Sequence, residues 1–381
     1  MMVDLKVKNT TENFNSYRDQ RVKSLFNAQD GSTFECEVKD VDLDWNWTIG
    51  VIVGPSGSGK TSLGHKIFKD GKIDDLYSGW HDDRAIVDDI APDGSFDAVT
   101  GALANVGLGD VPAWLRNFNA LSNGQKFRAG LARLVVNKPD HAVIDEFTSV
   151  IDRQVAKIGS KALSKAWRRN NEGQQIVLLS PHYDILDWLQ ADWVIDTKNY
   201  KFEKRRASKP PKIELQIIKT DSRYWRYFKP HYYLDLPEPI ASEHFIGTVN
   251  GELACHVVST PMFQCHAYRL TRLVTMPEWQ GAGVGMRFLN WVAEYHLEGH
   301  GRRGRKYPVI FHTSHPQLIN ALRHNKCWRQ TGAKFYEKRT RVAGGNIKAR
   351  TWPGNLRAIQ AFKYYGARGG GRAERVELDE S

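Results

Sequence analysis

The octapeptide GPSGSGKT, from Gly54 to Thr61, has the residue types and spacing of a phosphate-binding loop. Glycines let the backbone curl so that its amide N–H groups converge on an anion, and the helix that follows adds the positive end of its dipole. The pattern G-x-x-x-x-G-K-[S/T] is met in full, between an apolar run and a helical segment. We predict that the following residues bind the phosphates of a nucleotide: Gly54, Gly57, Ser58, Gly59, Lys60, Thr61 and Ser62.

A second apolar run, HAVIDE from His141 to Glu146, ends in two carboxylates. The C-terminal end of a strand is where an α/β sheet presents groups to a ligand. We expect Asp145 and the hydroxyl of Thr61 to hold Mg²⁺, and Glu146 to orient or deprotonate an attacking water. His182 follows the third apolar run, QQIVLLS, where it can contact the terminal phosphate.

The stretch LSNGQ, from Leu121 to Gln125, resembles the LSGGQ signature of ABC-type ATPases, with Asn123 in place of one glycine. The signature, VIDE, SVID and His182 follow one another in the order of that family, so the resemblance covers most of residues 30–200. It implies ATP and Mg²⁺ as ligands. It also implies a homodimer, because the family's signature helix receives the γ-phosphate held by the other copy. In this chain the signature residues are Ser122, Gly124 and Gln125.

One departure from the family pattern lies between the phosphate loop and the signature. No glutamine occurs between Ser62 and Ala120, where ABC-type ATPases normally have one that ligates Mg²⁺ and, in transporters, meets the membrane partner. Asp88 or Asp89 is a possible replacement. The gap argues against a transporter subunit.

Three continuous apolar runs predict that the N-terminal domain has a buried parallel sheet with helices on both faces. We therefore expect residues 1–203 to form an α/β domain, a P-loop NTPase of the ABC type. The charged, proline-bearing residues 204–216 are predicted to be a linker. Residues 217–381 combine short strands with a helix from about Met286 to Glu298, which predicts a mixed α+β domain with a basic C-terminal tail.

A second glycine-rich stretch, QGAGVG from Gln280 to Gly285, lies between a predicted strand and the long helix. It resembles the acyl-CoA pyrophosphate loop of GNAT acetyltransferases, and the strand and helix that follow it also keep the GNAT order. The resemblance implies that acetyl-CoA or another acyl-CoA is bound by Gln280, Gly281, Gly283, Gly285 and Arg287. The whole chain resembles fusions of an ABC-type ATPase with a predicted acetyltransferase, including the segments DEFTSVIDRQVAKIGSKA and TSHPQL.

The catalytic groups of such an acyltransferase are a base for the acceptor amine and an acid for the departing thiolate. Glu278 is a candidate base and Tyr336 a candidate acid, with His312 and His315 as further candidates. A solvated turn charge and a packed aromatic are equally compatible readings of Glu278 and Tyr336.

The charge of the chain is unevenly distributed. The total is +11, but residues 204–381 carry 30 Lys and Arg against 14 Asp and Glu. Within them, residues 222–234 alternate cations with aromatic rings, and residues 302–350 hold 13 cations and one carboxylate. Cations beside stacking rings suit a single-stranded or flipped nucleic acid, although an aromatic core element with a solvated basic face has the same composition.

Three functions are compatible with these features. The first is an ATPase coupled to acyl transfer onto a nucleic acid base, DNA or RNA. The second is an acetyltransferase acting on a protein or small amine, and the third is an ATP-switched nucleic-acid-binding dimer with an inactive GNAT domain.

The composition of the chain also predicts its cellular location and the state of its cysteines. The sequence lacks an 18-residue apolar stretch and an apolar N-terminal leader, so we expect a cytoplasmic protein with no membrane partner. Four scattered cysteines predict reduced thiols. The pairs Cys255-His256 and Cys265-His266 are interpreted as packing residues rather than metal ligands.

Overall fold

The computed structural model describes residues 3–10, 15–26, 33–68, 72–169, 171–205, 211–232, 234, 239, 241–301, 304–336 and 357–366. The chain forms two compact units. The first unit contains residues 1–82 and 118–211, and the second contains residues 83–117 and 212–381. We call residues 83–117 the inserted segment. The sequence places this segment in an N-terminal domain of residues 1–203, so its grouping with the second unit differs from that expectation.

The first unit is built on a five-stranded sheet of order β4-β5-β3-β6-β7. Its central strand β3 (Ile49–Val53) pairs in parallel with β5 (Gln175–Ser180) and β6 (Trp193–Asp196), and β4 (His141–Ile144) pairs in parallel with β5. The edge strand β7 (Lys201–Lys204) is antiparallel. Every residue of β3 is buried, as expected for a strand that carries apolar side chains on both faces. The predicted parallel sheet is confirmed.

Four helices follow the strands of this unit: α2 (Lys60–Ile67), α6 (Asn123–Asn137), α7 (Arg153–Arg168) and α8 (Leu186–Leu189). A short 3-10 turn, η1 (Phe118–Ala120), precedes α6. The apolar face of α7 is fully covered, and Trp167 is among the largest wholly buried side chains of the chain. These helices bury the apolar faces that a parallel sheet leaves exposed.

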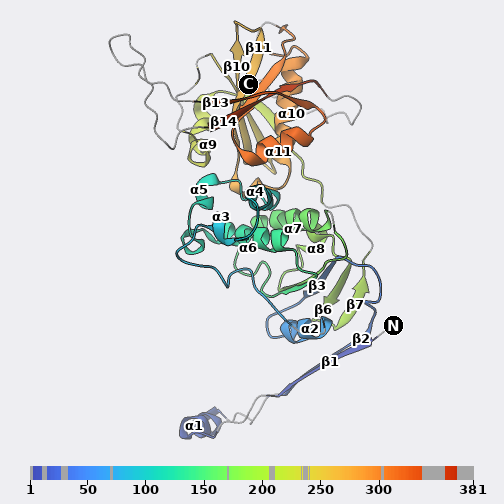
Figure 1. The fold of residues 1–381 in the computed structure, drawn as a ribbon. Helices are drawn as coiled ribbons and strands as arrows, with labels where there is room; N and C mark the ends of the chain where they lie inside the picture. The colour runs from blue at the N-terminus through green and yellow to red at the C-terminus, as the bar shows by residue number, and fades with distance from the viewer. Residues whose placement is uncertain are drawn as a thin grey trace. The chain divides into compact units, whose positions relative to one another are not determined.

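A separate antiparallel pair, β1 (Val3–Thr10) and β2 (Thr33–Val41), completes the first unit, with α1 (Tyr17–Phe26) beyond its end (Figure 1). The inner residues Val7, Cys36 and Val38 join the core that contains β3 and α2. This pair therefore packs beside the loop that connects β3 to α2.

The second unit contains a seven-stranded sheet of order β13-β14-β12-β11-β10-β9-β8 (Figure 1). The strands are β8 (Gln216–Thr220), β9 (Glu243–Val249), β10 (Glu252–Met262), β11 (Ala267–Thr275), β12 (Val309–Thr313), β13 (Trp328–Tyr336) and β14 (Arg357–Tyr364). All neighbours are antiparallel except β11 and β12. The chain returns between these two through α10 (Val284–Leu297), and α11 (Pro316–His324) follows β12. The predicted order of strands and helices is confirmed.

β11 and β12 pair only near their beginnings. Their parallel register runs from Tyr268, opposite Val309, to Leu270, opposite Phe311, although β11 continues to Thr275. On its other side β11 has a bulge against β10, at Arg272, whose φ is +52°. β11 and β12 are thus not paired with each other at the carboxyl end of β11, which leads into the glycine-rich loop.

The inserted segment is helical. It contains α3 (Ile86–Asp89), α4 (Phe96–Asn105) and α5 (Val111–Trp114), and Ser95 caps α4 by accepting from the backbone N–H of Ala98. α4 packs against α11 of the second unit. Among the residues that the structure describes, no helix is long and apolar enough to span a membrane.

Gly50 in the sheet and Gly101 in a helix differ in the space that a side chain would have. A Cβ on Gly50 of β3 would lie 2.0 Å from the Trp193 ring, whereas one on Gly101 of α4 would meet nothing within 4 Å. We expect Gly50→Ala to lower the free energy of unfolding by about 1–3 kcal/mol through overpacking. Gly101→Ala, the matched control, is expected to raise it by about 0.5–1 kcal/mol by removing backbone freedom from the unfolded chain. Urea denaturation measures both, and a stabilising Gly50→Ala would contradict the packing described.

Candidate functional site

The phosphate-binding loop connects β3 to α2 in a conformation that only glycine adopts readily. Gly57 has φ of +75° and Gly59, the residue before α2, has φ of +86°. A side chain at Gly59 would also enter the ring of Phe34 from β2, at 2.6 Å. The loop is therefore fixed in shape by its own glycines and by the packing of β2.

Lys60 is folded against this loop. Its ammonium group donates to the carbonyl oxygens of Gly54, at 3.0 Å, and Pro55, at 2.8 Å, and the side chain is buried. Burial lowers the pKa of Lys60, while the carboxylates of Glu146 and Asp145 act in the opposite direction. The positive charge therefore sits inside the loop, facing the end of β4.

A hydrogen bond between two oxygen atoms connects the end of β4 to the start of α2. Thr61 Oγ1 donates to Asp145 Oδ2 at 2.8 Å, and Asp145 Oδ1 accepts from the backbone N–H of Glu146 at 2.8 Å. A hydroxyl and a carboxylate are ligands that Mg²⁺ prefers, directly or through water. The donor set thus fits the predicted metal site, and the two residues predicted for it are in contact.

Beyond Asp145 the chain turns sharply to place Glu146 and Thr148. Both have positive φ, +50° and +69°, a costly conformation that persists only where the surroundings enforce it. Between them Phe147 is buried, and its N–H donates to the carbonyl of Leu179 in β5 at 2.9 Å. The turn is thereby tied to the neighbouring strand.

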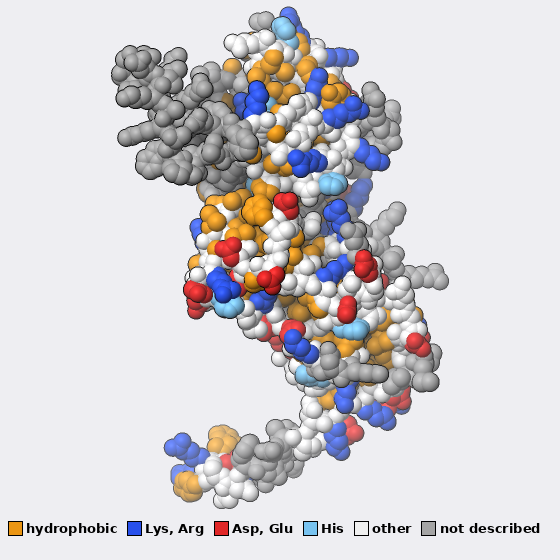
Figure 2. Space-filling view, in the orientation of Figure 1, with side chains coloured by type: hydrophobic (Ala, Val, Ile, Leu, Met, Phe, Trp, Pro, Cys, Tyr) orange, Lys and Arg blue, Asp and Glu red, His pale blue; other side chains and the backbone are white. Residues whose placement is uncertain are grey.

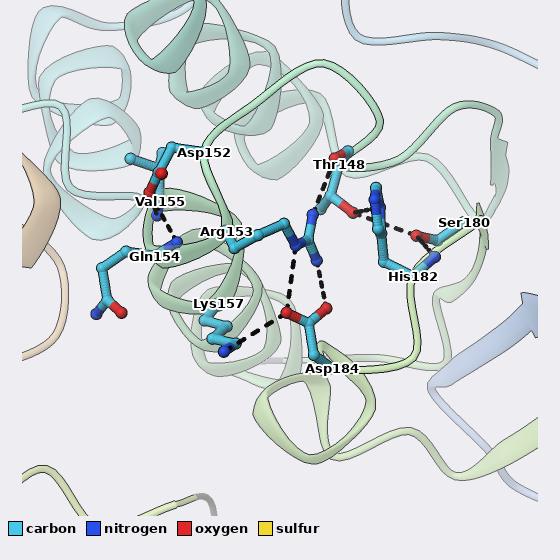
Figure 3. Close-up of polar contacts among 9 residues, drawn as sticks. All are labelled: Thr148, Asp152, Arg153, Gln154, Val155, Lys157, Ser180, His182 and Asp184. Carbon is cyan, nitrogen blue, oxygen red and sulfur yellow. Dashed lines mark hydrogen bonds and ion pairs between the residues drawn. The ribbon is translucent and has the colours of Figure 1, made fainter.

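His182 lies after β5, beside this turn (Figure 3). The backbone N–H of His182 donates to Ser180 Oγ at 3.2 Å. Its ring Nδ1 lies 3.5 Å from the hydroxyl of Thr148, which is itself 3.2 Å from Ser180 Oγ. Burial and the charge of Arg153 lower the pKa of His182, against the carboxylates of Asp184 and Glu146. The imidazole is therefore mostly neutral at pH 7.

An ion pair that sequence reasoning missed supports His182 and Thr148. Arg153, the first residue of α7, forms a two-point contact with the carboxylate of Asp184 and donates through Nη1 to the carbonyl of Thr148 at 3.2 Å (Figure 3). Lys157 adds a second cation 3.5 Å from Asp184. Burial opposes ionisation of Asp184, but these hydrogen bonds and charges outweigh it and lower its pKa. The only sequence signal is the position of Arg153 and Asp184 directly beside SVID and His182.

The signature stretch forms the predicted helix start. Ser122 Oγ accepts from the N–H of Gln125, and Gln125 Oε1 accepts from the N–H of Ser122, so the two side chains make a reciprocal cap on α6. Gly124 faces Val155 of α7. The contacts of Ser122 and Gln125 are thus with each other, and their action on a second copy's nucleotide stays a prediction. Asp88 and Asp89, the possible glutamine replacements, lie in α3 of the second unit.

The second glycine-rich loop has a similar shape. Gly281 and Gly283 have φ of +86° and +79°, and Gly283 precedes α10 with open space where its side chain would be. A Cβ on Gly285 would lie 2.6 Å from Thr275 Oγ1, so the first turn of α10 packs closely on the end of β11. The backbone of this loop suits an anion at the start of a 14-residue helix.

Two side chains predicted to bind the acyl-CoA have other partners. Gln280 accepts through Oε1 from the N–H of Gly109, at 2.9 Å, and donates through Nε2 to the carbonyl of Thr275, at 3.0 Å. Arg287 donates through Nη1 to the carbonyl of Ile213, at 3.0 Å. The oxygen of the Gln280 amide thus contacts the inserted segment and its nitrogen contacts the end of β11, while the role predicted for this side chain in binding acyl-CoA stays a prediction.

The candidate catalytic groups of the second unit stand on different elements of the chain. Glu278 is exposed in the 3-10 turn η4 (Pro277–Trp279), and the side chain of Tyr336 lies outside the described residues. His312 is half-buried, with its pKa lowered by burial and by Arg269. His315 bonds through Nε2 to the carbonyl of Gly109 at 2.9 Å, so that nitrogen holds the inserted segment rather than a substrate.

The aromatic and basic stretch at residues 222–234 is helical and partly core. It forms η2 (Ser222–Tyr224), α9 (Trp225–Phe228) and η3 (Lys229–His231). Trp225 and Phe228 are buried, and both rings lie 5.1 Å from the ring of His256. Tyr227 is exposed, and the Arg226 guanidinium lies over its ring. The stretch therefore contributes both core packing and an exposed cation beside a ring.

The two cysteine and histidine pairs differ in burial, because Cys255 and His256 lie in the core whereas Cys265 and His266 are exposed between β10 and β11. Cys255 and His256 are wholly buried on β10, and burial raises the pKa of the Cys255 thiol to about 12 and lowers the pKa of His256 to about 3. Within the described residues, no group of three or more His, Cys, Asp or Glu side chains is arranged to hold a metal ion. The basic residues 337–350 and the tail from residue 367 lie outside the described part of the chain.

Similarity to known proteins is confined to part of the chain. The ATP-binding protein EcfA1 of an energy-coupling factor transporter, from Geobacillus kaustophilus (strain HTA426), is 35% identical over 75 residues, 20% of this chain and 25% of that protein. The uncharacterized ABC transporter ATP-binding protein YknY of Bacillus subtilis (strain 168) is 36% identical over 86 residues, 23% of this chain and 35% of that protein. No protein-family model matches the chain.

Solved structures resemble the chain more distantly. The structure of cbiO1 from Clostridium perfringens, part of the ABC transporter complex cbiONQ, has 19% identity and a TM-score of 0.35, and covers 45% of this chain and 81% of its own. This chain spans about a quarter to a third of the two curated relatives, 25% and 35% of their lengths. The sequence relatives support an ABC-type nucleotide-binding domain in this chain.

The ion pair at His182 gives a test of this site. Because the charge of Arg153 lowers the pKa of His182, we expect Arg153→Gln to raise that pKa. The measurement is an NMR titration of the histidine ring signals, with His182 assigned by the signal lost in His182→Asn. Lys157→Gln, which removes a cation of the same helix that lies 3.5 Å from Asp184, is the control with the smaller effect. An unchanged or lower pKa in Arg153→Gln would show that the guanidinium does not act on His182.

Proposed function

We propose that the protein is an ABC-type ATPase coupled to an acyl-CoA-dependent N-acyltransferase that modifies a nucleic acid base. The observation that carries the ATPase part is the hydrogen bond of 2.8 Å between Thr61 and Asp145. It joins the phosphate loop after β3 to the carboxylates after β4, and these are the groups that phosphoryl transfer to water requires.

Each residue of the first site has a role in hydrolysis. The loop amides and Lys60 bind the β- and γ-phosphates, and Thr61 with Asp145 would hold Mg²⁺. When bound, the metal neutralises charge that develops on the phosphate oxygens. Glu146 accepts a proton from the attacking water, whose oxygen forms a bond to the γ-phosphorus while the bond to the β–γ bridging oxygen breaks. Neutral His182, held by Thr148 and Ser180, contacts the γ-phosphate.

A homodimer completes this site. The reciprocal cap of Ser122 and Gln125 leaves the N-terminus of the 15-residue helix α6 with a positive dipole end. In the proposed dimer this end lies against the γ-phosphate bound by the other copy. ATP is then held between two copies and stabilises their association by mass action.

We expect Glu146→Gln to reduce ATP hydrolysis by about 10²–10⁴-fold, because the attacking water loses its base. The same variant should accumulate as a dimer in the presence of Mg²⁺ and ATP, measured by size exclusion with light scattering. Lys60→Ala placed in the Glu146→Gln background is expected to return the protein to a monomer. Full hydrolysis by Glu146→Gln would refute the role assigned to this carboxylate.

The acyltransferase part rests on the end of β11. There the strand is no longer paired with β12, and it leads through Gly281 and Gly283 into α10. Ligands of parallel strands bind at their carboxyl ends, and the helix start offers amide groups to a pyrophosphate. We assign the acyl-CoA phosphates to Gly281, Gly283 and Gly285, and the acyl chain to the opening between β11 and β12.

In the transfer step the acceptor amine attacks the thioester carbonyl, so that a C–N bond forms and the C–S bond breaks. The amine loses a proton to a base, for which Glu278 is the candidate, and the thiolate of CoA takes a proton from an acid, for which Tyr336 is the candidate. These two roles are proposals from sequence, supported by the exposure of Glu278 beside the loop.

A nucleic acid acceptor is supported by charge. In Figure 2 the visible face over the sheet of the second unit carries many Lys and Arg side chains and few Asp or Glu, whereas acidic side chains are visible over the inserted segment. The exposed Arg226 and Tyr227 add a cation beside a ring, a combination that binds unpaired bases. The next test distinguishes this function from two others. In one the acceptor is a protein or small amine, and in the other the domain is inactive and the protein is a nucleic-acid-binding dimer.

Gly283→Glu tests the second site. A carboxylate about 4 Å from a phosphate repels it by roughly 4 kcal/mol near a protein surface, so acetyl-CoA binding should weaken by at least about tenfold. Gly251→Glu is the matched control, because Gly251 also has positive φ, +80°, and open space at its Cβ. Isothermal titration measures the binding.

The acceptor is identified by analysing the nucleosides of cells that express each variant. An acylated nucleoside is expected with wild type and Gly251→Glu and not with Gly283→Glu. Equal nucleoside profiles with intact acetyl-CoA binding would point to a protein or small-amine acceptor, and absence of acetyl-CoA binding by the wild type to an inactive domain.

A further inference from the structure

The inserted segment leaves and re-enters the first unit at neighbouring points. On the side of the first unit, Asn119 donates to the carboxylate of Asp82. On the side of the second unit, the N–H of Ile86 donates to the carbonyl of Arg116 at 2.9 Å. The two ends of the segment are therefore held together as a stem.

The far end of the segment is a tight turn from Val106 to Asp110, bound by three side chains of the second unit. Gly109 donates its N–H to Gln280 Oε1, and its carbonyl lies 2.9 Å from His315 Nε2. Gln317 Nε2 donates to the carbonyl of Leu108 at 3.2 Å. Three side chains thus satisfy three backbone groups of two adjacent residues.

The turn fits closely against the glutamine side chains, which would have to shift slightly to admit a side chain at Gly109. A Cβ on Gly109 would lie 3.1 Å from Gln280 Oε1 and 3.2 Å from Gln317 Oε1. The ring of Trp114 lies edge-on to His315, with centroids 6.0 Å apart, and its Nε1 also donates to the carbonyl of Leu108, at 2.8 Å. Burial lowers the pKa of His315, so the neutral ring donates through Nε2 to Gly109. The contact is partly buried and is made by directional hydrogen bonds.

Each of the two segments in this contact lies close in sequence to the N-terminus of a helix at which we propose that a phosphate binds. Gln280 is bonded to the end of β11 and stands three residues before Gly283, which begins α10. The stem of the inserted segment ends at Asn117, five residues before Ser122, which caps α6. The inserted segment thus provides a connected route from the start of the signature helix to Gln280, the residue that opens the second loop.

We propose that the clamp of Gln280, His315 and Gln317 on Leu108 and Gly109 couples the two sites, so that nucleotide binding changes the conformation of the acyl-CoA loop. This inference rests on the proposed function of both loops. Coupling between two sites is reciprocal, so acyl-CoA changes the affinity for ATP by the same factor as ATP changes the affinity for acyl-CoA.

The link itself is tested without acyl-CoA. Hydrogen exchange of residues 276–290 is followed in Glu146→Gln protein before and after Mg²⁺ and ATP are added. We expect the exchange rate of this loop to change in Glu146→Gln, and not to change when His315→Phe and Gln317→Leu are added to it. Arg323→Gln is the control on α11, because Arg323 contacts Gln330 and Gln360 rather than the inserted segment.

The consequence for the second ligand is tested by titration. In Glu146→Gln and in its Arg323→Gln derivative, Mg²⁺ and ATP should change the Kd of acetyl-CoA by about fivefold or more, and the His315→Phe/Gln317→Leu derivative should show no change. A loop that does not respond in protein shown to bind ATP, or that responds equally without the clamp, overturns the inference. A loop that responds through the clamp in protein unable to bind acetyl-CoA upholds the link and rejects only the proposed acyl-CoA site.

Discussion

The parallel pairing of β3, β5 and β4 is the constraint on which the nucleotide site depends. Val53 lies opposite Ser180, and Ile144 lies opposite Leu178, so the three strands end at the same edge of the sheet. This register brings the loop after β3, the carboxylates after β4 and the histidine after β5 to one place. A shift of one residue in any strand would move the group that follows it by about 3.3 Å along the strand, away from the other two.

The features that the sequence predicts well depend on residues that are close together in the chain. The glycines at 57, 59, 281 and 283 stand where the backbone has positive φ, and Ser122 with Gln125 forms the helix cap that their spacing indicates. The strand ends follow from apolar runs, so Thr61, Asp145 and His182 could be placed on one edge before any contact was known. Each of these features depends on neighbours in the chain or on the period of a strand.

The features that sequence reasoning missed are polar contacts between distant segments. Gln280 belongs to a glycine-rich motif, yet its amide bonds to Gly109, a residue 171 positions away. Arg153, which precedes β5 in the sequence, contacts the turn at Thr148 and pairs with Asp184, which follows β5, and their sequence positions do not identify them as a pair. The grouping of residues 83–117 with the second unit has the same origin, since it depends on backbone groups that carry no sequence signal.

The central claim is that one Mg²⁺–ATP site is formed by the ends of β3, β4 and β5. Its most direct test is a crystal structure of the protein with Mg²⁺ and a non-hydrolysable ATP analogue. The account predicts phosphates over the amides of residues 57–61, Mg²⁺ about 2.1 Å from Thr61 Oγ1, and Asp145 in contact with the metal directly or through water. A nucleotide bound elsewhere, with Thr61 still hydrogen-bonded to Asp145 and the loop free of phosphate, would contradict it.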